Sequence, residues 1–271
     1  MRPNALKTLL CLCCLSLLAL TLATAEEPKL SEDVIRQFLL TAKVTDSKQI
    51  SKGITSPWRL TLTDGTLTHD AAFQAVDERK TTQTFASGRT EMNFRDSYHF
   101  NIAAYELSKM VGLDYMMPVT VERKWQGKTG ALSWWITWKW DEAMRIKEKI
   151  QPPDPDAWNK QMHRMRVFSE LVYDTDRNLG NVLITEDWHL RMIDFTRAFR
   201  ISGDLFNAKN LEKFDRGLLE KIKALTAENI EARCKPHLGK AEVKAIIQRR
   251  DKIVAIAAEK VAKNGETVAL Y

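Results

Sequence analysis

The chain changes from an alternating pattern of apolar and polar residues to a helical pattern about halfway along its length. Trp58, Leu60 and Leu62 alternate with polar neighbours, as in a strand with one buried face, and Asp64-Gly65 is typical of a hairpin turn. In the second half, apolar residues recur every three or four positions, which predicts helices. The segments predicted as strands are 57–63, 66–77, 119–124 and 131–140, with a hairpin at 182–194, and the predicted helices are 31–42, 101–111, 155–172, 226–234 and 240–263.

This order of elements predicts an α+β fold with two lobes and a cleft between them. The first half is rich in strands with one helix inside it, and the second half is mainly helical with one hairpin. The change falls near Trp140, so the predicted lobes are residues 26–141 and 142–271. Within the second lobe, Asp154 is suited to cap a helix whose first residue is Pro155.

Residues 1–25 have the layout of a secretory signal peptide. Arg2 and Lys7 give a basic start, residues 8–22 carry no charge, and the small residues 23–25 suit a cleavage point. We therefore expect export to a periplasm, to a lumenal compartment or out of the cell, with no transmembrane span left after cleavage. The alternative is a leader that stays as a membrane anchor, since its uncharged run approaches the length of a membrane span.

Cysteine content, charge and motifs narrow the class of protein further. Three of the four cysteines lie in the leader, so only Cys234 remains after cleavage and no internal disulfide can form. Removal of the leader lowers the formal net charge from +6 to +4, and the basic residues are scattered, so no nucleic-acid partner is expected. The five histidines show no paired metal spacing and no Gly-x-Ser-x-Gly motif is present, which argues against a zinc or serine hydrolase.

Three polar residues after the predicted helix at 155–172 have the chemistry that phosphoryl transfer needs. Asp176 and Asn181 lie in one loop, and Asp194 ends the second strand of the predicted hairpin. Because a hairpin returns the chain, we expect Asp194 to lie beside Asn181 and all three residues to converge. Mg²⁺ takes carboxylate and amide oxygens as ligands, and a further carboxylate must orient the acceptor hydroxyl and receive its proton.

The motif Asp-Arg-x-x-x-Asn at 176–181, followed by an apolar strand, a turn and Ile-Asp-Phe at 193–195, resembles kinase loops. It is similar to the catalytic and metal-binding loops of the phosphatidylinositol 3- and 4-kinase superfamily, and of the related HipA-type and four-jointed-type secretory kinases. The resemblance is strongest over 170–196 and weaker over 50–200, where it rests on the order of elements. It implies a two-lobed protein-kinase-like fold that binds ATP with Mg²⁺ or Mn²⁺ and transfers the γ-phosphoryl group to a hydroxyl.

Carried over residue by residue, the resemblance assigns roles to four positions. Asp176 matches the Asp that activates the acceptor, and Asn181 and Asp194 match the metal ligands. Phe195 matches the Phe that follows the metal-binding Asp beside the nucleotide.

The sequence departs from the family pattern at several positions. Asn178 stands where lipid kinases usually have His, and Thr196 stands where Asp-Phe-Gly motifs have Gly. Gln74 occupies the strand position at which the phosphate-binding Lys is expected. If that strand runs on, Lys80 shares the face of Gln74, so we expect Lys80 to be the substitute cation, held by Glu91.

The remaining parts of a nucleotide pocket are predicted around the strands of the first lobe. Gly53 and Thr55 precede the first strand and are expected to contact the phosphates. The tryptophan-rich strand at 131–140 is expected to lead into the connector between the lobes, beside the adenine pocket. Alternation along this strand predicts that most of its tryptophans pack in the core.

Three functions are compatible with these residues. The first is an exported ATP-dependent phosphotransferase, whose acceptor could be a protein, a lipid, a sugar or another small molecule. The second is a pseudokinase-type module that binds a nucleotide or a partner without chemistry, as the missing lysine and the single glycine of the loop suggest. The third is a nucleotidyl transferase on the same fold. Asp176 favours a transferase, because a binding module needs no proton acceptor at that position.

Overall fold

The computed structural model describes residues 30–50, 57–85, 88 and 90–271. It divides the chain into Met1–Ser31 and one compact unit, Glu32–Tyr271. The predicted signal peptide at 1–25 and the predicted phosphate contacts Gly53 and Thr55 lie outside the described residues.

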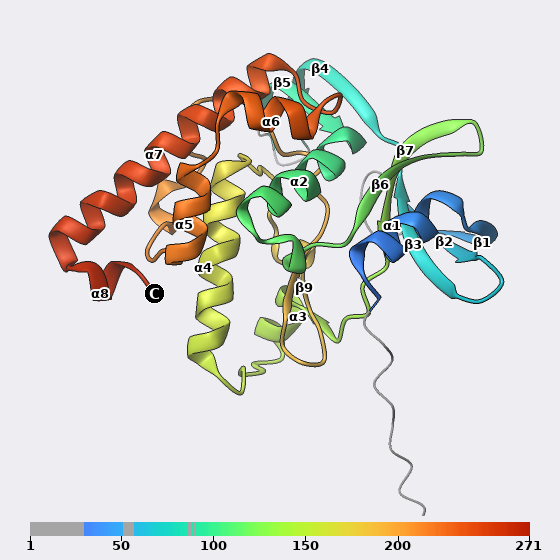
Figure 1. The fold of residues 1–271 in the computed structure, drawn as a ribbon, viewed down its shortest axis with the longest axis horizontal. Helices are drawn as coiled ribbons and strands as arrows, with labels where there is room; N and C mark the ends of the chain where they lie inside the picture. Colours follow the sequence, from blue (N-terminus) through green and yellow to red (C-terminus); the bar gives the residue numbers. More distant parts are fainter. Residues whose placement is uncertain (1–29, 51–56, 86–87, 89) are drawn as a thin grey trace, which may run out of the picture. The chain divides into compact units, whose positions relative to one another are not determined.

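The alternating segments of the first half form a five-stranded antiparallel sheet (Figure 1). Its strands are β1 Lys43–Gln49, β2 Trp58–Thr63, β3 Thr68–Gln74, β6 Thr120–Trp125 and β7 Lys128–Trp134. Across the sheet they follow the order β1-β2-β3-β7-β6. The alternation buries Leu60 and Leu62 of β2, and they pack with Phe38 and Leu39 of helix α1 (Glu32–Thr41). Burial of apolar surface therefore holds α1 against the sheet.

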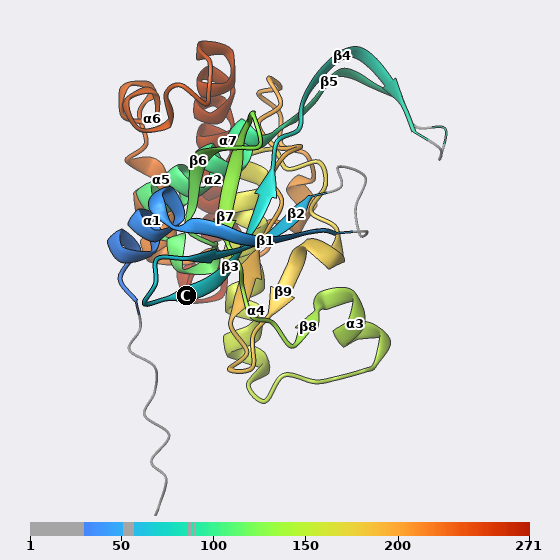
Figure 2. The same cartoon turned by 90° about the vertical axis from the view of Figure 1, so that its right-hand side faces the viewer.

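Two further strands, β4 (Asp77–Thr84) and β5 (Thr90–Ser97), pair into a ribbon that extends away from the five-stranded sheet (Figure 2). Nearly all side chains of β4 are exposed, so this ribbon has little apolar core. The chain then enters helix α2 (Tyr98–Val111), which is buried along most of its length. Phe100 and Leu107 pack in the core of the helical part, whereas Ile102 packs with Ala131 of β7. Helix α2 therefore connects the sheet to the helices.

The second half is helical around a small sheet. Its helices are α3 Glu142–Lys147, α4 Pro155–Leu171, α5 Arg216–Lys223, α6 Ala227–Cys234, α7 Lys240–Asn264 and α8 Glu266–Ala269. As the sequence predicts, the Asp154 carboxylate accepts from the first amides of α4, and Pro155 is the first helical residue. The small sheet has the strands β8 Trp140–Asp141, β9 Val182–Ile184 and β10 Leu190–Met192 in the order β10-β9-β8.

The sequence therefore predicts the sheet-rich and helical halves correctly, but it misplaces elements between them. The predicted strand at 131–140 ends at Trp134, and residues 135–138 run irregularly to β8. Strand β1 and the β4–β5 ribbon were not predicted, because their residues are mostly polar on both faces. The boundary between the lobes at 141–142 stays a prediction.

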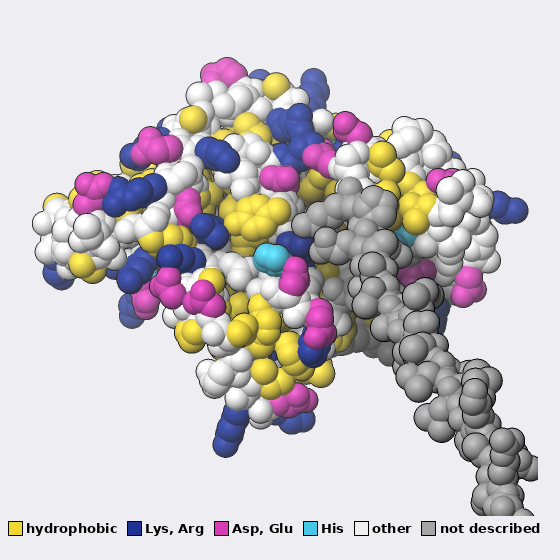
Figure 3. All heavy atoms as spheres, turned by 60° about the horizontal axis from the view of Figure 1, so that its bottom comes forward, with side chains coloured by type: hydrophobic (Ala, Val, Ile, Leu, Met, Phe, Trp, Pro, Cys, Tyr) yellow, Lys and Arg dark blue, Asp and Glu magenta, His cyan; other side chains and the backbone are white. Residues whose placement is uncertain are grey.

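The surface of the described unit carries charges of both signs, and its cysteine is buried. On the face drawn in Figure 3, basic and acidic side chains are interspersed. Cys234 is fully buried in α6, as expected of a small apolar residue, and burial raises the pKa of its thiol to about 12. No helix among the described residues is long and apolar enough to cross a membrane.

A buried arginine anchors the long helix α7. The guanidinium of Arg249 is fully buried and donates to the carbonyl oxygens of Leu171 at 2.8 Å, Arg200 at 2.9 Å and Ser202 at 2.5 Å. These bonds tie α7 to the end of α4 and to the segment that follows the predicted metal-binding residues. Burial lowers the pKa of Arg249 to about 10, so the side chain stays charged at neutral pH.

We predict that Arg249→Met lowers the free energy of unfolding by about 3 kcal/mol or more, because one buried and two partly buried carbonyls lose a charged donor. Lys252→Met is the matched control on the same helix, since Lys252 pairs with Asp204 in solvent and such pairs contribute about 0–1 kcal/mol. Urea denaturation followed by circular dichroism measures both. Equal losses in the two variants would contradict the anchoring role.

Candidate functional site

A cavity of about 430 Å³ lies between the five-stranded sheet and the β9–β10 hairpin. Its apolar wall includes Ala72 of β3, Ile136 of the connector after β7, and Leu183 of β9. Tryptophans at 134, 135 and 138 also line it, so the connector between the halves of the chain borders the cavity. None of the tryptophans at 131–140 is fully buried, so the expectation that most of them pack in the core was wrong. Its polar lining includes Gln74, Asn101, Asn181 and Asp194.

A buried arginine fixes the loop on which the candidate residues lie. Arg177 pairs with Asp174 at 2.6 Å, and their side chains are only 8% and 0% exposed. The same guanidinium donates to the carbonyl of Asn181 at 2.8 Å and to that of Ile193 at 2.7 Å. Its centre also lies 4.2 Å from the ring centroid of Phe195. One side chain therefore joins the loop at 174–181 to the end of the hairpin.

The hairpin brings Asn181 and Asp194 to one cavity, as the sequence predicts. Strand β10 pairs with β9 so that Met192 faces Val182, and the Ile193 amide donates to the Asn181 carbonyl at 3.2 Å. Asn181 precedes β9 as the last residue of a short 3₁₀ turn (Leu179–Asn181), and its side-chain amide donates to the Asp176 carbonyl at 3.1 Å. Asp194 has a φ of 56°, in the left-handed region, which turns the chain directly after β10.

The carboxylate of Asp194 sits in a site that disfavours its negative charge. It keeps some contact with the cavity, but loss of solvent raises the pKa of the carboxyl above its ordinary value. The Thr196 hydroxyl donates to it at 3.0 Å and Gln74 also acts as a donor, but both only partly offset the loss of water. A partly desolvated carboxylate beside an amide oxygen has the donor chemistry of a divalent-cation site.

A second carboxylate, which sequence reasoning missed, lies near Asp194. Asp96 at the end of β5 is buried, and burial raises the pKa of its carboxyl, with the negative charge of Asp194 adding to the effect. It shares the Thr196 hydroxyl, and one of its oxygens has no hydrogen-bond partner among the described residues. A cation at this position would relieve both carboxylates.

Gln74 is part of a neutral hydrogen-bonded chain. The Asn101 amide of α2 donates to the Gln74 side-chain oxygen at 2.6 Å, which leaves the Gln74 NH₂ group to face Asp194. The Asn101 oxygen accepts from the Phe195 amide at 2.7 Å. Phe195 itself is buried, lines the cavity and packs edge to face on Phe168. Asn101 was not singled out in the sequence, because nothing in its local pattern distinguishes it from other polar helix residues.

The expected Lys80–Glu91 pair is not formed. Strand β3 ends at Gln74 and Lys80 belongs to β4, so Lys80 does not line the cavity that Gln74 lines. Lys80 pairs with Glu78 at 2.8 Å, with both side chains about half exposed. Glu91 on β5 pairs with Arg197 at 2.7 Å and with Arg200. The expectation was wrong because it assumed that the strand containing Gln74 continues.

Asp176 lies in the same loop as Asn181 but does not line the cavity, so the expected convergence of three residues holds only for Asn181 and Asp194. Its side chain is 40% exposed, with a carboxylate oxygen 4.0 Å from the Arg197 guanidinium. Asn178 donates to that carboxylate at 3.3 Å. The carboxylate is thus accessible to a second substrate while its loop is held by Arg177.

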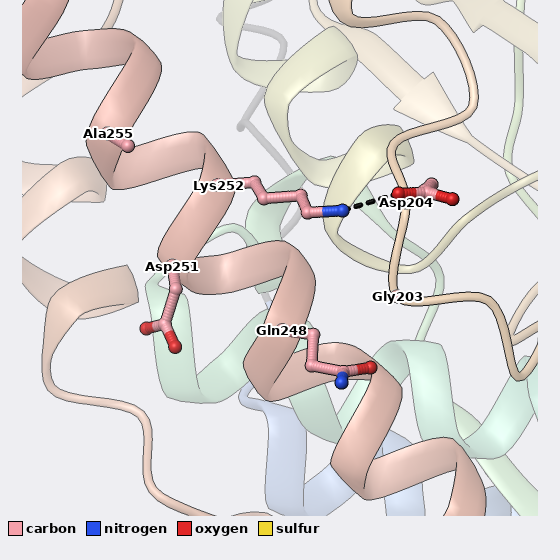
Figure 4. A pocket seen from close by; sticks show the side chains of 6 residues that line it. All are labelled: Gly203, Asp204, Gln248, Asp251, Lys252 and Ala255. Atoms are coloured by element: carbon pink, nitrogen blue, oxygen red, sulfur yellow. Dashed lines mark hydrogen bonds and ion pairs between the residues drawn. The ribbon is translucent and has the colours of Figure 1, made fainter.

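A different hollow lies beside α7, around Gly203 and Asp204 (Figure 4). Lys252 reaches across it to Asp204 at 2.5 Å, and the Asp204 side chain is 81% exposed. Its other labelled side chains do not converge on a common point in Figure 4. This hollow offers no comparable set of metal or phosphate ligands among the described residues.

Comparison with known proteins places the fold. No family model matches the chain, and no curated protein matches it in sequence. Among solved structures, a hydra Fam20 solved with sugar is similar with a TM-score of 0.64 and 12% identity, over 88% of this chain and 91% of that one.

Two proteins named as kinases are also similar in structure. A Golgi casein kinase matches with a TM-score of 0.61 and 12% identity, over 88% of this chain and 77% of that one. The Helicobacter pylori proinflammatory kinase CtkA matches with a TM-score of 0.52 and 10% identity, over 83% and 98%. At identities this low the likeness concerns the fold alone, and the chain has a two-lobed, atypical kinase-like fold with a sheet-rich N-terminal part and a helical C-terminal part.

Proposed function

We propose that this protein is an ATP-dependent phosphotransferase. The observation that carries the proposal is the convergence of Asn181 and Asp194 on one cavity of about 430 Å³, in a fold shared with kinases. Its apolar wall suits a purine ring, and its polar end suits phosphates bound with a cation. The relation to phosphatidylinositol kinases and to HipA-type kinases rests on the motifs at 176–181 and 193–195.

In this proposal Asn181 and Asp194 are the protein ligands of Mg²⁺ or Mn²⁺. The metal would neutralise charge on the nucleotide phosphates when bound. Asp96 and Thr196 would hold the Asp194 carboxylate in place, since Thr196 donates to Asp194 and is also hydrogen-bonded to Asp96. Phe195 lines the cavity, and its backbone amide donates to the Asn101 side chain, which fixes its position. Gly53 and Thr55 remain predicted phosphate contacts.

Asp176 is proposed to orient the acceptor hydroxyl and to receive its proton. Its carboxylate is exposed, and its loop is joined to the metal-binding residues through Arg177 and the Asn181 side chain. An accessible carboxylate at a fixed place is what a general base needs, because the proton must pass over hydrogen-bond distance. The acceptor can be a protein, a lipid or a small molecule.

We also propose that the protein acts after export. The basic, uncharged and small-residue segments at 1–25 support a cleaved leader, and one structural neighbour is a Golgi enzyme by name. The phosphotransferase would then work in a lumenal, periplasmic or extracellular compartment that supplies ATP.

Binding without transfer is the second candidate, and the Gln74–Asn101 pair favours it. In kinases a Lys of the sheet contacts the phosphates and forms an ion pair with a Glu of the following helix. Here two neutral amides occupy the corresponding places, so the phosphates lose a cation from the sheet. A nucleotidyl transferase is a third candidate that the same cavity would serve.

Labelled ATP separates these candidates. We predict that residues 26–271, with Mg²⁺ or Mn²⁺ and a lysate, transfer label from the γ position and none from the α position. Asp194→Asn and Asp176→Asn should lose transfer, whereas Asp204→Asn, an exposed Asp of the hollow beside α7, should keep it. Transfer of α label would establish nucleotidyl transfer instead, and binding of ATP without any transfer would establish the binding module.

The pKa of Asp194 gives a second prediction. Because burial raises this pKa, there is a pH window in which the folded protein still holds the Asp194 proton and the unfolded chain has lost it. The free energy of unfolding of the metal-free protein therefore rises as the pH falls through that window. Binding of Mg²⁺ needs the ionised carboxylate, so stabilisation by Mg²⁺ and ATP must fade in the same direction.

Asp194→Asn should therefore stabilise the metal-free protein at neutral pH and reduce its pH dependence in that window, part of which Asp96 would still supply. It should also weaken Mg²⁺–ATP binding by more than the roughly 10- to 100-fold that loss of an outer-shell partner costs. Thermal unfolding with and without Mg²⁺ and ATP at several pH values measures both effects. A variant that Mg²⁺ and ATP stabilise as strongly as the original chain would refute the metal assignment.

Substitution of the neutral pair tests how the phosphates are bound. We predict that Gln74→Ala lowers turnover about tenfold or more, equivalent to about 1.4 kcal/mol, while Lys80→Ala has no effect, because only Gln74 reaches the cavity. Gln74→Lys and Asn101→Glu should each be harmful alone, and the double variant should recover activity. Gln74→Lys by itself would pair with Asp194 in place of the cation, and Asn101→Glu by itself adds an unpaired charge among buried groups.

Steady-state kinetics of the four variants and the double variant provide the measurement. Unchanged turnover in Gln74→Ala would show that Gln74 has no part in transfer. If the original chain binds ATP without transfer and the double variant gains it, the binding module is the correct function.

A further inference from the structure

Three metal-ligating side chains meet away from the cavity, where α2, β6 and the segment between α6 and α7 come together. They are His99 at the start of α2, Glu122 of β6 and His237. The Nδ1 atoms of His99 and His237 are 2.9 Å apart, and each lies 3.9 Å from the Glu122 Oε2 atom. The described residues hold no other group of at least three such side chains.

The distances are close to those of a tetrahedral zinc site. With Zn–N and Zn–O bonds of about 2.0–2.1 Å, ligand atoms of a tetrahedral site lie about 3.3 Å apart. The observed separations of 2.9 and 3.9 Å lie on either side of that value. Shifts of about half an ångström in these three side chains, which are 11–41% exposed, would therefore complete the geometry. Imidazole nitrogen and carboxylate oxygen are donors that Zn²⁺ prefers.

The protonation of the cluster also suits a metal. Two imidazole Nδ1 atoms at 2.9 Å cannot both carry a proton toward each other, so at least one offers a lone pair. That lone pair is the donor that an imidazole offers to a metal ion.

A neighbouring tyrosine holds the carboxylate in place. The Tyr98 hydroxyl donates to Glu122 Oε2 at 3.3 Å. Outer-shell partners of metal ligands hold the ligating groups in place through hydrogen bonds of this kind.

We propose that His99 Nδ1, His237 Nδ1 and the Glu122 carboxylate bind one Zn²⁺ ion, with water as the fourth ligand. The Glu122 side chain is 41% exposed, so solvent reaches that position. The ion fastens the start of α2 to β6 and to the segment before α7. His99 lies two residues before Asn101, so the ion also steadies the helix that positions Gln74 and Phe195.

Zinc content tests the proposal without any assay of activity. The full chain, loaded with ZnCl₂ and dialysed against a weak chelator, should retain one zinc per molecule by plasma mass spectrometry. His99→Ala, His237→Ala and Glu122→Gln should each lose it, and Tyr98→Phe should bind it about 10- to 100-fold more weakly. Glu122→Gln keeps the side-chain shape, so its result does not depend on whether the histidine variants fold.

Two controls separate this site from others. His189→Ala removes an exposed histidine that pairs with Asp187, and Asp194→Asn removes the proposed magnesium ligand in the cavity. Both should retain one zinc. Zinc should also raise the unfolding temperature of the original chain and of both controls, but not that of Glu122→Gln. Zinc content that is equal in the original chain and Glu122→Gln, or absent from both, would overturn the proposal.

Discussion

The guanidinium of Arg177 holds the loop at 174–181 and the end of the β9–β10 hairpin in one arrangement. It is 8% exposed, and its donors go to Asp174 and to the carbonyls of Asn181 and Ile193. A charge withdrawn from water in this way is tolerated only when its hydrogen bonds are complete, so the loop cannot move without losing them. The places of Asn181 and Asp194, and through them the chemistry of the cavity, depend on this one side chain.

The charge balance of the cavity follows from a second constraint. A Lys–Glu pair and a Gln–Asn pair both have zero net charge. Replacing one pair with the other therefore leaves the net charge around Asp194 unchanged. The proposed difference lies in the charge beside the phosphates, because the Gln74 NH₂ group can donate hydrogen bonds but carries no positive charge. In the proposed complex, a cation on Asn181 and Asp194 would then neutralise more of the phosphate charge than in a kinase with the lysine. The nearby carboxylate of Asp96, with an oxygen that has no partner among the described residues, favours the presence of such a cation.

Local patterns predicted the parts of this site that depend on nearby residues. The hairpin, the capped helix α4 and the convergence of Asn181 on Asp194 follow from short-range spacing, and the structure contains all three. The prediction for Lys80 was wrong because alternation says nothing about where a strand ends, and β3 ends at Gln74. Asn101 and the His99–Glu122–His237 cluster could not be predicted, since tertiary packing alone brings residues so far apart in sequence together. The roles of Asp176, Asn181 and Asp194 stay predictions.

If the cavity under the sheet binds a nucleotide, it does so through a divalent cation on Asn181 and Asp194. Anomalous diffraction from crystals grown with Mn²⁺ and a non-hydrolysable ATP analogue locates both the metal and the nucleotide. We predict one strong manganese peak within bonding distance of the Asn181 side-chain oxygen and the Asp194 carboxylate, with the purine against Ala72 and Ile136. A nucleotide bound elsewhere, or a nucleotide in the cavity with no metal on these two residues, would contradict this mode of binding.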